Sequence, residues 1–271
     1  MGATASIRRC VCAFVLSAAG CTTLPNGHAW GNAATFAPGW ERVRVSAVNA
    51  ARDPWVWAPL LGAGALQIDN FDHRISDWAR AETPIFGSTD EAKRWSDDLR
   101  NASAIAHAAT VVFTPSGASG SEWLLNKAKG YSVQLAALGV ANGITTVLKK
   151  TTDRERPNGS STESFPSGHA TTAAVYDRMA ADNLESIEMS RGARLSLDIG
   201  LDTLTFATSW ARVEAGAHFP SDTLVSVALG NFCARFFDDA FLGLDSTRAS
   251  LAFVPVPGGG EVRWQVSFGE R

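Results

Sequence analysis

The residues best able to do chemistry fall into three short clusters between positions 149 and 222. Together they supply several cations, two imidazoles and a carboxylate able to orient one imidazole. In chain order they are Lys149, Arg156-Pro157, Pro166-Ser167-Gly168-His169, Arg212, His218 and Asp222. Such a set can hold a tetrahedral anion such as phosphate, attack it with a ring nitrogen and protonate the group that leaves.

The middle cluster indicates the start of a helix. Ser167 takes the cap position, and the free backbone N–H groups with the positive end of the helix dipole form an anion site. Gly168 lets an oxyanion approach those amides closely, and His169 falls in the first turn. Pro-Ser-Gly turns are also common without any ligand, so this cluster alone does not define a site.

The last cluster pairs a histidine with a carboxylate four residues later. Pro220 suits the first turn of a helix, which puts His218 just outside it and Asp222 just within. The carboxylate can then accept the Nδ1 proton of His218, leaving Nε2 as the nucleophilic lone pair. The alternative is that Asp222 only favours the helix N-terminus and His218 does no chemistry.

The first cluster offers two cations. Lys149 ends an apolar helix, where a cation can also sit simply because of the helix dipole. Arg156 precedes Pro157 and is therefore held extended, able to project its guanidinium inward. Arginine donates two parallel hydrogen bonds to phosphate oxygens, whereas lysine acts as a point charge.

Taken together and in this order, the clusters resemble the signature of the type 2 phosphatidic acid phosphatase superfamily, which includes bacterial acid phosphatases and vanadium haloperoxidases. The matching pattern is Lys, six residues, Arg-Pro; then Pro-Ser-Gly-His; then Arg, five residues, His, three residues, Asp. Two features depart from it. Ala211 stands where the family usually has Ser, and the gap between Pro157 and Pro166 is short.

The resemblance implies a metal-independent phosphatase with no cofactor, acting on phosphomonoesters or diphosphates through a phosphohistidine. It assigns His218 as nucleophile, Asp222 as its orienting group and His169 as proton donor and later base. The phosphate would be bound by Lys149, Arg156, Ser167, Gly168 and Arg212. Alternatives are a vanadate-dependent haloperoxidase, whose known relatives are longer chains, and a non-catalytic surface lipoprotein. The substrate, a lipid phosphate, a prenyl diphosphate or a soluble ester, stays open.

The pattern along the chain predicts a mainly α, single-domain bundle of about six core helices with a C-terminal β-hairpin. The domain expectation is a signal peptide at 1–20, a tether and lead-in at 21–50, a helical phosphatase domain at 51–245 and the hairpin at 246–271. The first helix is expected to start at Asp53 and to include the apolar run 55–68. Further helices are expected at 91–113, 122–150, 167–186, 191–213 and 220–237. The hairpin is expected from β-rich runs that flank Pro257 and three glycines.

The N-terminus predicts export. Arg8 and Arg9 precede a short apolar run, and small residues then lead to Cys21, an arrangement that resembles a bacterial lipobox. We therefore expect a periplasmic protein anchored to the outer membrane by a lipid on Cys21. Cys233 would be the one cysteine left in the body and a buried small hydrophobe. A net charge of −3 gives no electrostatic case for nucleic acid.

The segment 130–148 is uncharged and long enough to span a bilayer. Its polar and small residues, including Gln134 and Asn142, favour instead a central helix buried inside the bundle. We therefore expect a body that is soluble or associated with a membrane surface.

Overall fold

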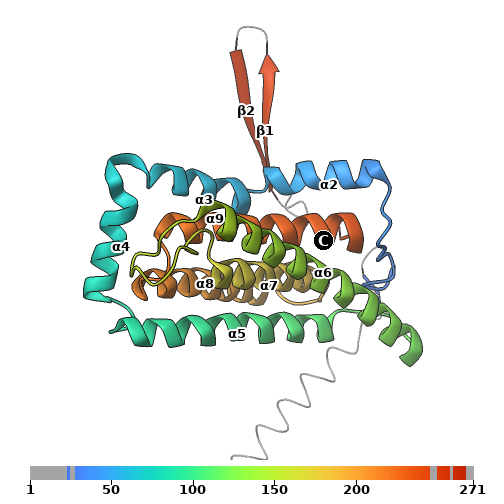
Figure 1. Ribbon diagram of the computed structural model, residues 1–271. Coiled ribbons are helices and arrows are strands. Elements are labelled where there is room, and N and C mark those ends of the chain that lie inside the picture. Colours follow the sequence, from blue (N-terminus) through green and yellow to red (C-terminus); the bar gives the residue numbers. More distant parts are fainter. Residues whose placement is uncertain (1–22, 25–27, 245–248, 257–258, 267–271) are drawn as a thin grey trace, which may run out of the picture.

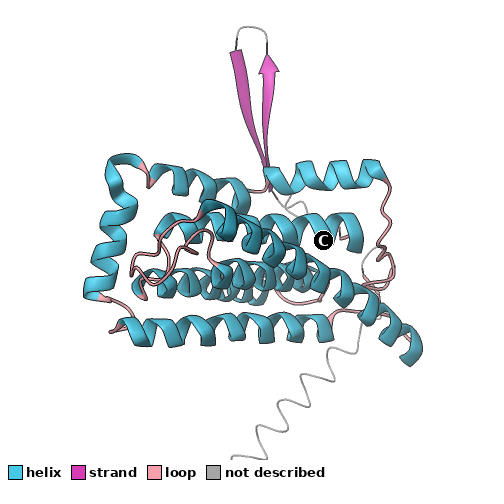
Figure 2. Ribbon diagram, viewed as in Figure 1, coloured by secondary structure: helices cyan, strands magenta, loops and turns pink. Residues whose placement is uncertain are grey.

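A computed structural model describes residues 23–24, 28–244, 249–256 and 259–266. The described body is mainly helical, which confirms the predicted class (Figures 1 and 2). The α-helices are α2 (Trp40–Arg52), α3 (Pro54–Ala65), α4 (Phe71–Glu82), α5 (Thr89–Phe113), α6 (Gly120–Thr152), α7 (Gly168–Glu185), α8 (Arg191–Glu214) and α9 (Pro220–Phe237). Two short elements, η2 (Ile68–Asn70) and η3 (Asp238–Leu242), adjoin α4 and α9.

Most of these helices begin at a residue whose side chain caps the first turn. Asp53 accepts from the backbone N–H of Trp55 at 2.9 Å, with Pro54 in the first helical position of α3. Helices α5, α6, α7 and α8 each begin after a serine that accepts an amide hydrogen bond three residues on. Those serines are Ser88, Ser119, Ser167 and Ser190. The predicted cap at Ser167 is confirmed, and α5 and α6 begin two residues before the starts predicted at 91 and 122.

The interior of the bundle is formed by α7 and α9, in which most residues are buried. Figure 1 shows α5 along one side of them and α2 with α3 along the other, while α4 connects the two sides at one end. The core contains Val133, Val175, Met179, Cys233 and Phe237, all from α6, α7 and α9. Cys233 is 2% exposed, which agrees with its predicted role as a buried small hydrophobe.

The prediction of a tether and a loosely structured lead-in at 21–50 is wrong for the residues from 40 onward. Residues 40–52 form α2, and Trp30 is fully buried with its ring N–H donating to Asn183 at 3.1 Å. Helix α2 has no side-chain cap, and its only buried residues are Ser46 and Ala50. The helix itself is amphipathic, but the Gly-, Ala-, Pro- and Asn-rich composition of the whole segment led to the prediction of a loosely structured lead-in. Helix α4 was missed because the charged residues from Asp69 onward were interpreted as an interruption of the preceding apolar segment.

The expectation that residues 130–148 lie buried inside the bundle is also wrong. Helix α6 packs on α7 and α9 along one face, and only 28% of its apolar 18-residue window is buried. Leu135, Val140, Ile144 and Val147 are exposed on its outer face. Within the described residues, α6 is the one helix long and apolar enough to cross a membrane.

Two strands follow the helical body, β1 (Ala249–Val256) and β2 (Gly259–Val266). They pair antiparallel, with Ala249 opposite Val266 and Val256 opposite Gly259, and Figure 1 shows them pointing away from the helices. The predicted signal peptide and Cys21 lie outside the described residues.

Helices α7 and α9 approach closely at Gly230, which makes this glycine a test of the packing. A Cβ there would lie 2.7 Å from the Cβ of Ala174 and 2.8 Å from the carbonyl oxygen of Thr171. We expect Gly230→Ala to lower the free energy of unfolding by about 2–3 kcal/mol, because backbone must move. Gly139→Ala, on the open face of α6 with nothing within 4 Å, should instead raise it by about 0.5–1 kcal/mol. Urea denaturation of both variants checks the pair, and equal effects would contradict the packing.

Candidate active site

The predicted clusters meet where four helices end. Helices α7 and α9 contribute their N-termini, and α6 and α8 contribute their C-termini. Arg212 lies in the last turn of α8 and is 6% exposed, and His218 precedes α9 and is 1% exposed. The loop 153–167 joins α6 to α7 and carries Arg156 and the turn before His169.

His218 is held by a backbone carbonyl. Its Nδ1 lies 2.5 Å from the carbonyl oxygen of Ser164, which can only accept, so Nδ1 carries the proton and Nε2 keeps its lone pair. Asp222 does not take that proton directly, because its Oδ2 lies 3.9 Å from Nδ1. The predicted direct contact between the two side chains is therefore wrong, although the tautomer it was meant to fix is the one that the carbonyl selects.

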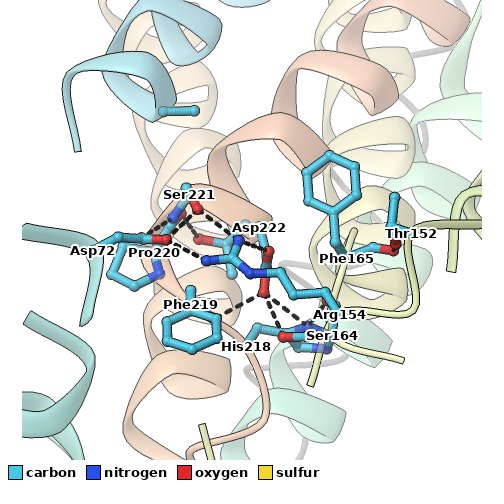
Figure 3. Close-up of polar contacts among 12 residues, drawn as sticks. Asp72, Thr152, Arg154, Ser164, Phe165, His218, Phe219, Pro220, Ser221 and Asp222 are labelled. Carbon is cyan, nitrogen blue, oxygen red and sulfur yellow. Dashed lines mark hydrogen bonds and ion pairs between the residues drawn. The ribbon is translucent and has the colours of Figure 1, made fainter. Parts of the chain in front are cut away.

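Asp222 has other hydrogen-bond partners, which hold its carboxylate away from the ring of His218. Its Oδ2 accepts from the hydroxyl of Ser164 at 2.5 Å and from the backbone N–H of Phe219 at 2.9 Å. Its Oδ1 accepts from Arg154 at 2.5 Å (Figure 3). Burial raises the pKa of Asp222, while these donors act to lower it. Asp222 thus orients His218 through Ser164, whose hydroxyl binds the carboxylate and whose carbonyl binds the ring.

Arg154 completes this network and was not recognised in the sequence, where it resembled part of a solvated loop. Its guanidinium bridges Asp222 and Asp72 of α4, with the Asp72 contact at 2.7 Å. It also lies 4.2 Å from the ring centroid of Phe219 and donates to Ser221 at 3.1 Å. Figure 3 shows Arg154 between the two carboxylates. The only local signal was its position between Lys149 and Arg156.

The three predicted cations act on one another and on His218. Burial first, then Arg212, Lys149 and Arg156 hold the pKa of His218 well below its usual value. Burial and Arg156 lower the pKa of Arg212 to about 10. Burial, Arg156 and Arg212 lower the pKa of Lys149. The cations therefore lie close to the imidazole, as the sequence predicted.

The cations also have donors to spare for an anion. Arg212 donates from one terminal nitrogen to Ser96 at 3.2 Å, and Lys149 donates to the carbonyl of Glu163 at 2.5 Å. The buried Nε atoms of Arg156 and Arg212 have no hydrogen-bond partner among the described residues. Buried donors without partners are costly, so a bound oxyanion is the natural acceptor for both.

The turn before α7 differs from the expectation in one respect. The backbone N–H of Ser167 donates to Ser226 at 2.7 Å, and its hydroxyl accepts from Ala170 at 3.4 Å. Both groups of Ser167 therefore already have hydrogen-bond partners within the protein. The surroundings of Gly168 are open, because a Cβ there would meet nothing closer than Thr145 at 3.9 Å, and its role in binding an oxyanion stays a prediction. The backbone at Gly168 is thus the part of the turn that an oxyanion can approach.

His169 lies beside α5, which the sequence did not connect with the site. Its Nε2 lies 2.8 Å from Oδ1 of Asp97 and 3.0 Å from a terminal nitrogen of Arg100. Burial and then Arg212 lower the pKa of His169 to about 4, and Asp97 acts in the opposite direction. Asp97 and Arg100 could not be found from spacing, because they lie some seventy positions away from His169.

The geometry thus gathers three cations around a buried imidazole at the meeting point of four helix ends. Among the residues described in the structure, no group of three or more His, Cys, Asp or Glu side chains could hold a metal ion.

Residues 130–240 match the PAP2 superfamily, and this region, which contains all three clusters, belongs to that family. This match supports a phosphatase in general terms. The fold resembles the crystal structure of the first transmembrane PAP2 type phosphatidylglycerolphosphate phosphatase from Bacillus subtilis, with a TM-score of 0.51 and 21% identity. The match covers 68% of this chain and 92% of that one. No curated protein sequence matches.

The bridge made by Arg154 can be tested by its removal. Arg154→Met leaves Asp72 and Asp222 buried without their cation, so we expect a loss of about 3 kcal/mol in the free energy of unfolding. Arg74→Met breaks the exposed pair with Asp69 on the same side of the molecule and should change it by less than about 0.5 kcal/mol. Urea denaturation at pH 7 measures both. Equal free energies of unfolding for the two variants would show that the bridge makes no contribution to stability.

Proposed function

We propose that this protein hydrolyses phosphomonoesters or diphosphates through a phosphohistidine formed on His218. The observation that carries the proposal is the state of that ring. It is buried, its Nδ1 proton is bound to a carbonyl, and its pKa is held low by burial and by Arg212, Lys149 and Arg156. A neutral imidazole with a free Nε2 next to three cations is suited to attack a phosphorus atom.

In the first step, Nε2 of His218 attacks phosphorus, and the bond to the leaving oxygen breaks. The electron pair of that bond goes to the leaving oxygen, which takes a proton from His169. Lys149, Arg156 and Arg212 bind the other oxygens and stabilise the charge of the transition state, together with the backbone at Gly168. The donors of Arg156 and Arg212 that lack partners fit this task.

In the second step, His169 accepts a proton from water, and that water displaces His218 from phosphorus. Nδ1 of His218 keeps its proton on the Ser164 carbonyl throughout, so the ring leaves as the same tautomer that attacked. Phosphate is released and His169 is protonated again for the next cycle.

A lipid phosphate is one supported substrate class. The apolar outer face of α6 runs from Leu124 to Val147 and ends two residues before Lys149 of the site. Contact between this face and a membrane would bring the site to the depth of lipid headgroups. The Bacillus subtilis relative is described as a transmembrane phosphatidylglycerolphosphate phosphatase, which agrees with this class. Export and a lipid anchor on Cys21 in the outer membrane remain part of the proposal.

Replacement of the nucleophile is the direct test. We expect His218→Ala to lower turnover of a chromogenic phosphate ester by at least about 10³-fold without unfolding the protein, because no other group can form the intermediate. His28→Ala, which removes an exposed imidazole near the N-terminus, should keep wild-type activity. Wild-type enzyme quenched in alkaline denaturant should carry labelled phosphate on histidine, because the P–N bond of phosphohistidine survives alkali and is hydrolysed in acid.

Turnover by His218→Ala at the wild-type rate would refute the nucleophile. The haloperoxidase alternative makes a separate forecast: added vanadate should then support halide oxidation by peroxide. The proposed phosphatase should instead be inhibited by vanadate, which resembles its transition state.

The low pKa of His169 predicts an acid preference. In the free protein this pKa is about 4, because burial and the Arg212 and Arg100 charges outweigh Asp97. Since the protonated ring is the required form, kcat/KM should rise as pH falls from 8 to 5, by up to tenfold per unit. His218 stays neutral over that range because its pKa is lowered well below 6.5. A rate profile corrected for ionisation of the substrate measures this, and His169→Gln should flatten it.

A further inference from the structure

Helix α5 lines the site although it lies outside the three clusters. Ser96 accepts from Arg212, and Asp97 and Arg100 both reach Nε2 of His169. These positions fall within one and a half turns of α5, so a single face of the helix contacts both a cation and an imidazole of the site. A surface helix that only covered the bundle would not need this set of polar contacts.

The two α5 side chains favour different forms of His169. Arg100 can only donate, so it stabilises a ring whose Nε2 carries a lone pair. The carboxylate of Asp97 can only accept, so it stabilises a ring whose Nε2 carries a proton. The hydrogen bond to His169 is the main cause that lowers the pKa of Asp97, so this carboxyl is ionised at neutral pH. The shorter contact, 2.8 Å against 3.0 Å, is the one with Asp97.

We propose that Asp97 is a positioning residue that accepts the Nε2 proton of His169 and thereby assigns proton transfer to Nδ1. This inference rests on the proposed function of His169. With Nε2–H bound to Asp97, Nδ1 is the nitrogen that exchanges protons in both forms of the ring. The charged ring donates from Nδ1, and the neutral ring accepts there.

With this assignment, every proton that moves in the two steps has a donor and an acceptor. In the first step the Nδ1–H bond of His169 breaks, and its proton goes to the leaving oxygen as that oxygen takes the electron pair from phosphorus. In the second step a proton from water returns to Nδ1 as the oxygen of that water bonds to phosphorus. The Nε2–H bond stays intact in both steps, and Asp97 stays ionised.

Asp97 also offsets the cations around His169. Arg212 from α8 and Arg100 from α5 both disfavour the charged ring, and Asp97 is the one carboxylate among the named influences on the pKa of His169. A salt bridge between Asp97 and Arg100 on the helix surface, 3.3 Å long, would by itself matter little. The contact with a ring on α7 gives Asp97 a role beyond that pair.

The test uses leaving groups of different basicity. A nitrophenyl phosphate needs little protonation of its leaving oxygen, whereas an alkyl phosphate such as glycerol phosphate needs much. The quantity to measure is kcat/KM, because it ends at the first irreversible step, in which the leaving group departs. Asp97→Asn should lower it by about 10- to 100-fold for the alkyl phosphate and by less than about threefold for the nitrophenyl ester.

The neighbouring residue supplies a matched control. Asp98 is exposed on the same helix, and Asp98→Asn makes the same change of charge. It should keep both activities, and Asp97→Glu should recover part of the loss with the alkyl phosphate. The acid-side rise of kcat/KM should move to lower pH in Asp97→Asn, since Arg212 and Arg100 would act on the ring without a carboxylate to oppose them.

Two results would overturn the inference while the proposed function stands. Asp97→Asn could match wild type on both substrates, or it could lose both equally with no displacement of the pH profile, as a structural defect would. If His218→Ala hydrolyses both esters at the wild-type rate, the proposed function fails and the role of Asp97 fails with it.

Discussion

The buried charge of Asp222 is the constraint on which the arrangement of the site depends. This carboxylate is fully buried, and a buried charge persists only with partners that replace water. Arg154 supplies the opposite charge, and Ser164 and the amide of Phe219 supply the remaining donors. Both Arg154 and Ser164 belong to the loop between α6 and α7, so the need to satisfy Asp222 sets the path of that loop. The carbonyl that fixes the His218 tautomer is a consequence of this path.

The three clustered cations of the site impose a second constraint, which is the repulsion between like charges. Arg156 and Arg212 lie close enough to Lys149 to lower its pKa, and all three cations lower the pKa of His218. Glu163 and Asp222 oppose this effect only in part at Lys149. Like charges held together in a partly buried site cost free energy, and the fold has to supply it through packing elsewhere. The close contact of α7 with α9 at Gly230 is one such source. In the proposed function, an oxyanion bound among these cations removes their mutual repulsion, so the electrostatic cost in the free protein would favour phosphate binding.

Sequence patterns sufficed for the parts of this molecule that local rules govern. Ser167 and Pro220 mark helix starts because capping is decided within one turn, and the motif spacing identified Lys149, Arg156, Arg212 and His218, which the fold brings close together. Helix α2 was missed because its segment was interpreted from its composition, and the exposure of α6 could not be predicted from its composition either. The contacts of Asp72 and Asp97 depend on how distant helices pack, and a single sequence does not record such packing.

The two histidines show how the placement of a carboxylate assigns a role to an imidazole. A carboxylate in direct contact favours the charged ring, and one held back behind a carbonyl fixes the tautomer while favouring charge less. At His218 the carboxylate stands 3.9 Å away and the carbonyl of Ser164 makes the contact, which suits a nucleophile that must stay neutral. At His169 the carboxylate of Asp97 makes the contact itself at 2.8 Å, which suits a ring that must carry a proton. The difference in role that we propose for the two rings therefore follows from the partner that each ring nitrogen meets, in a site whose cations act on both.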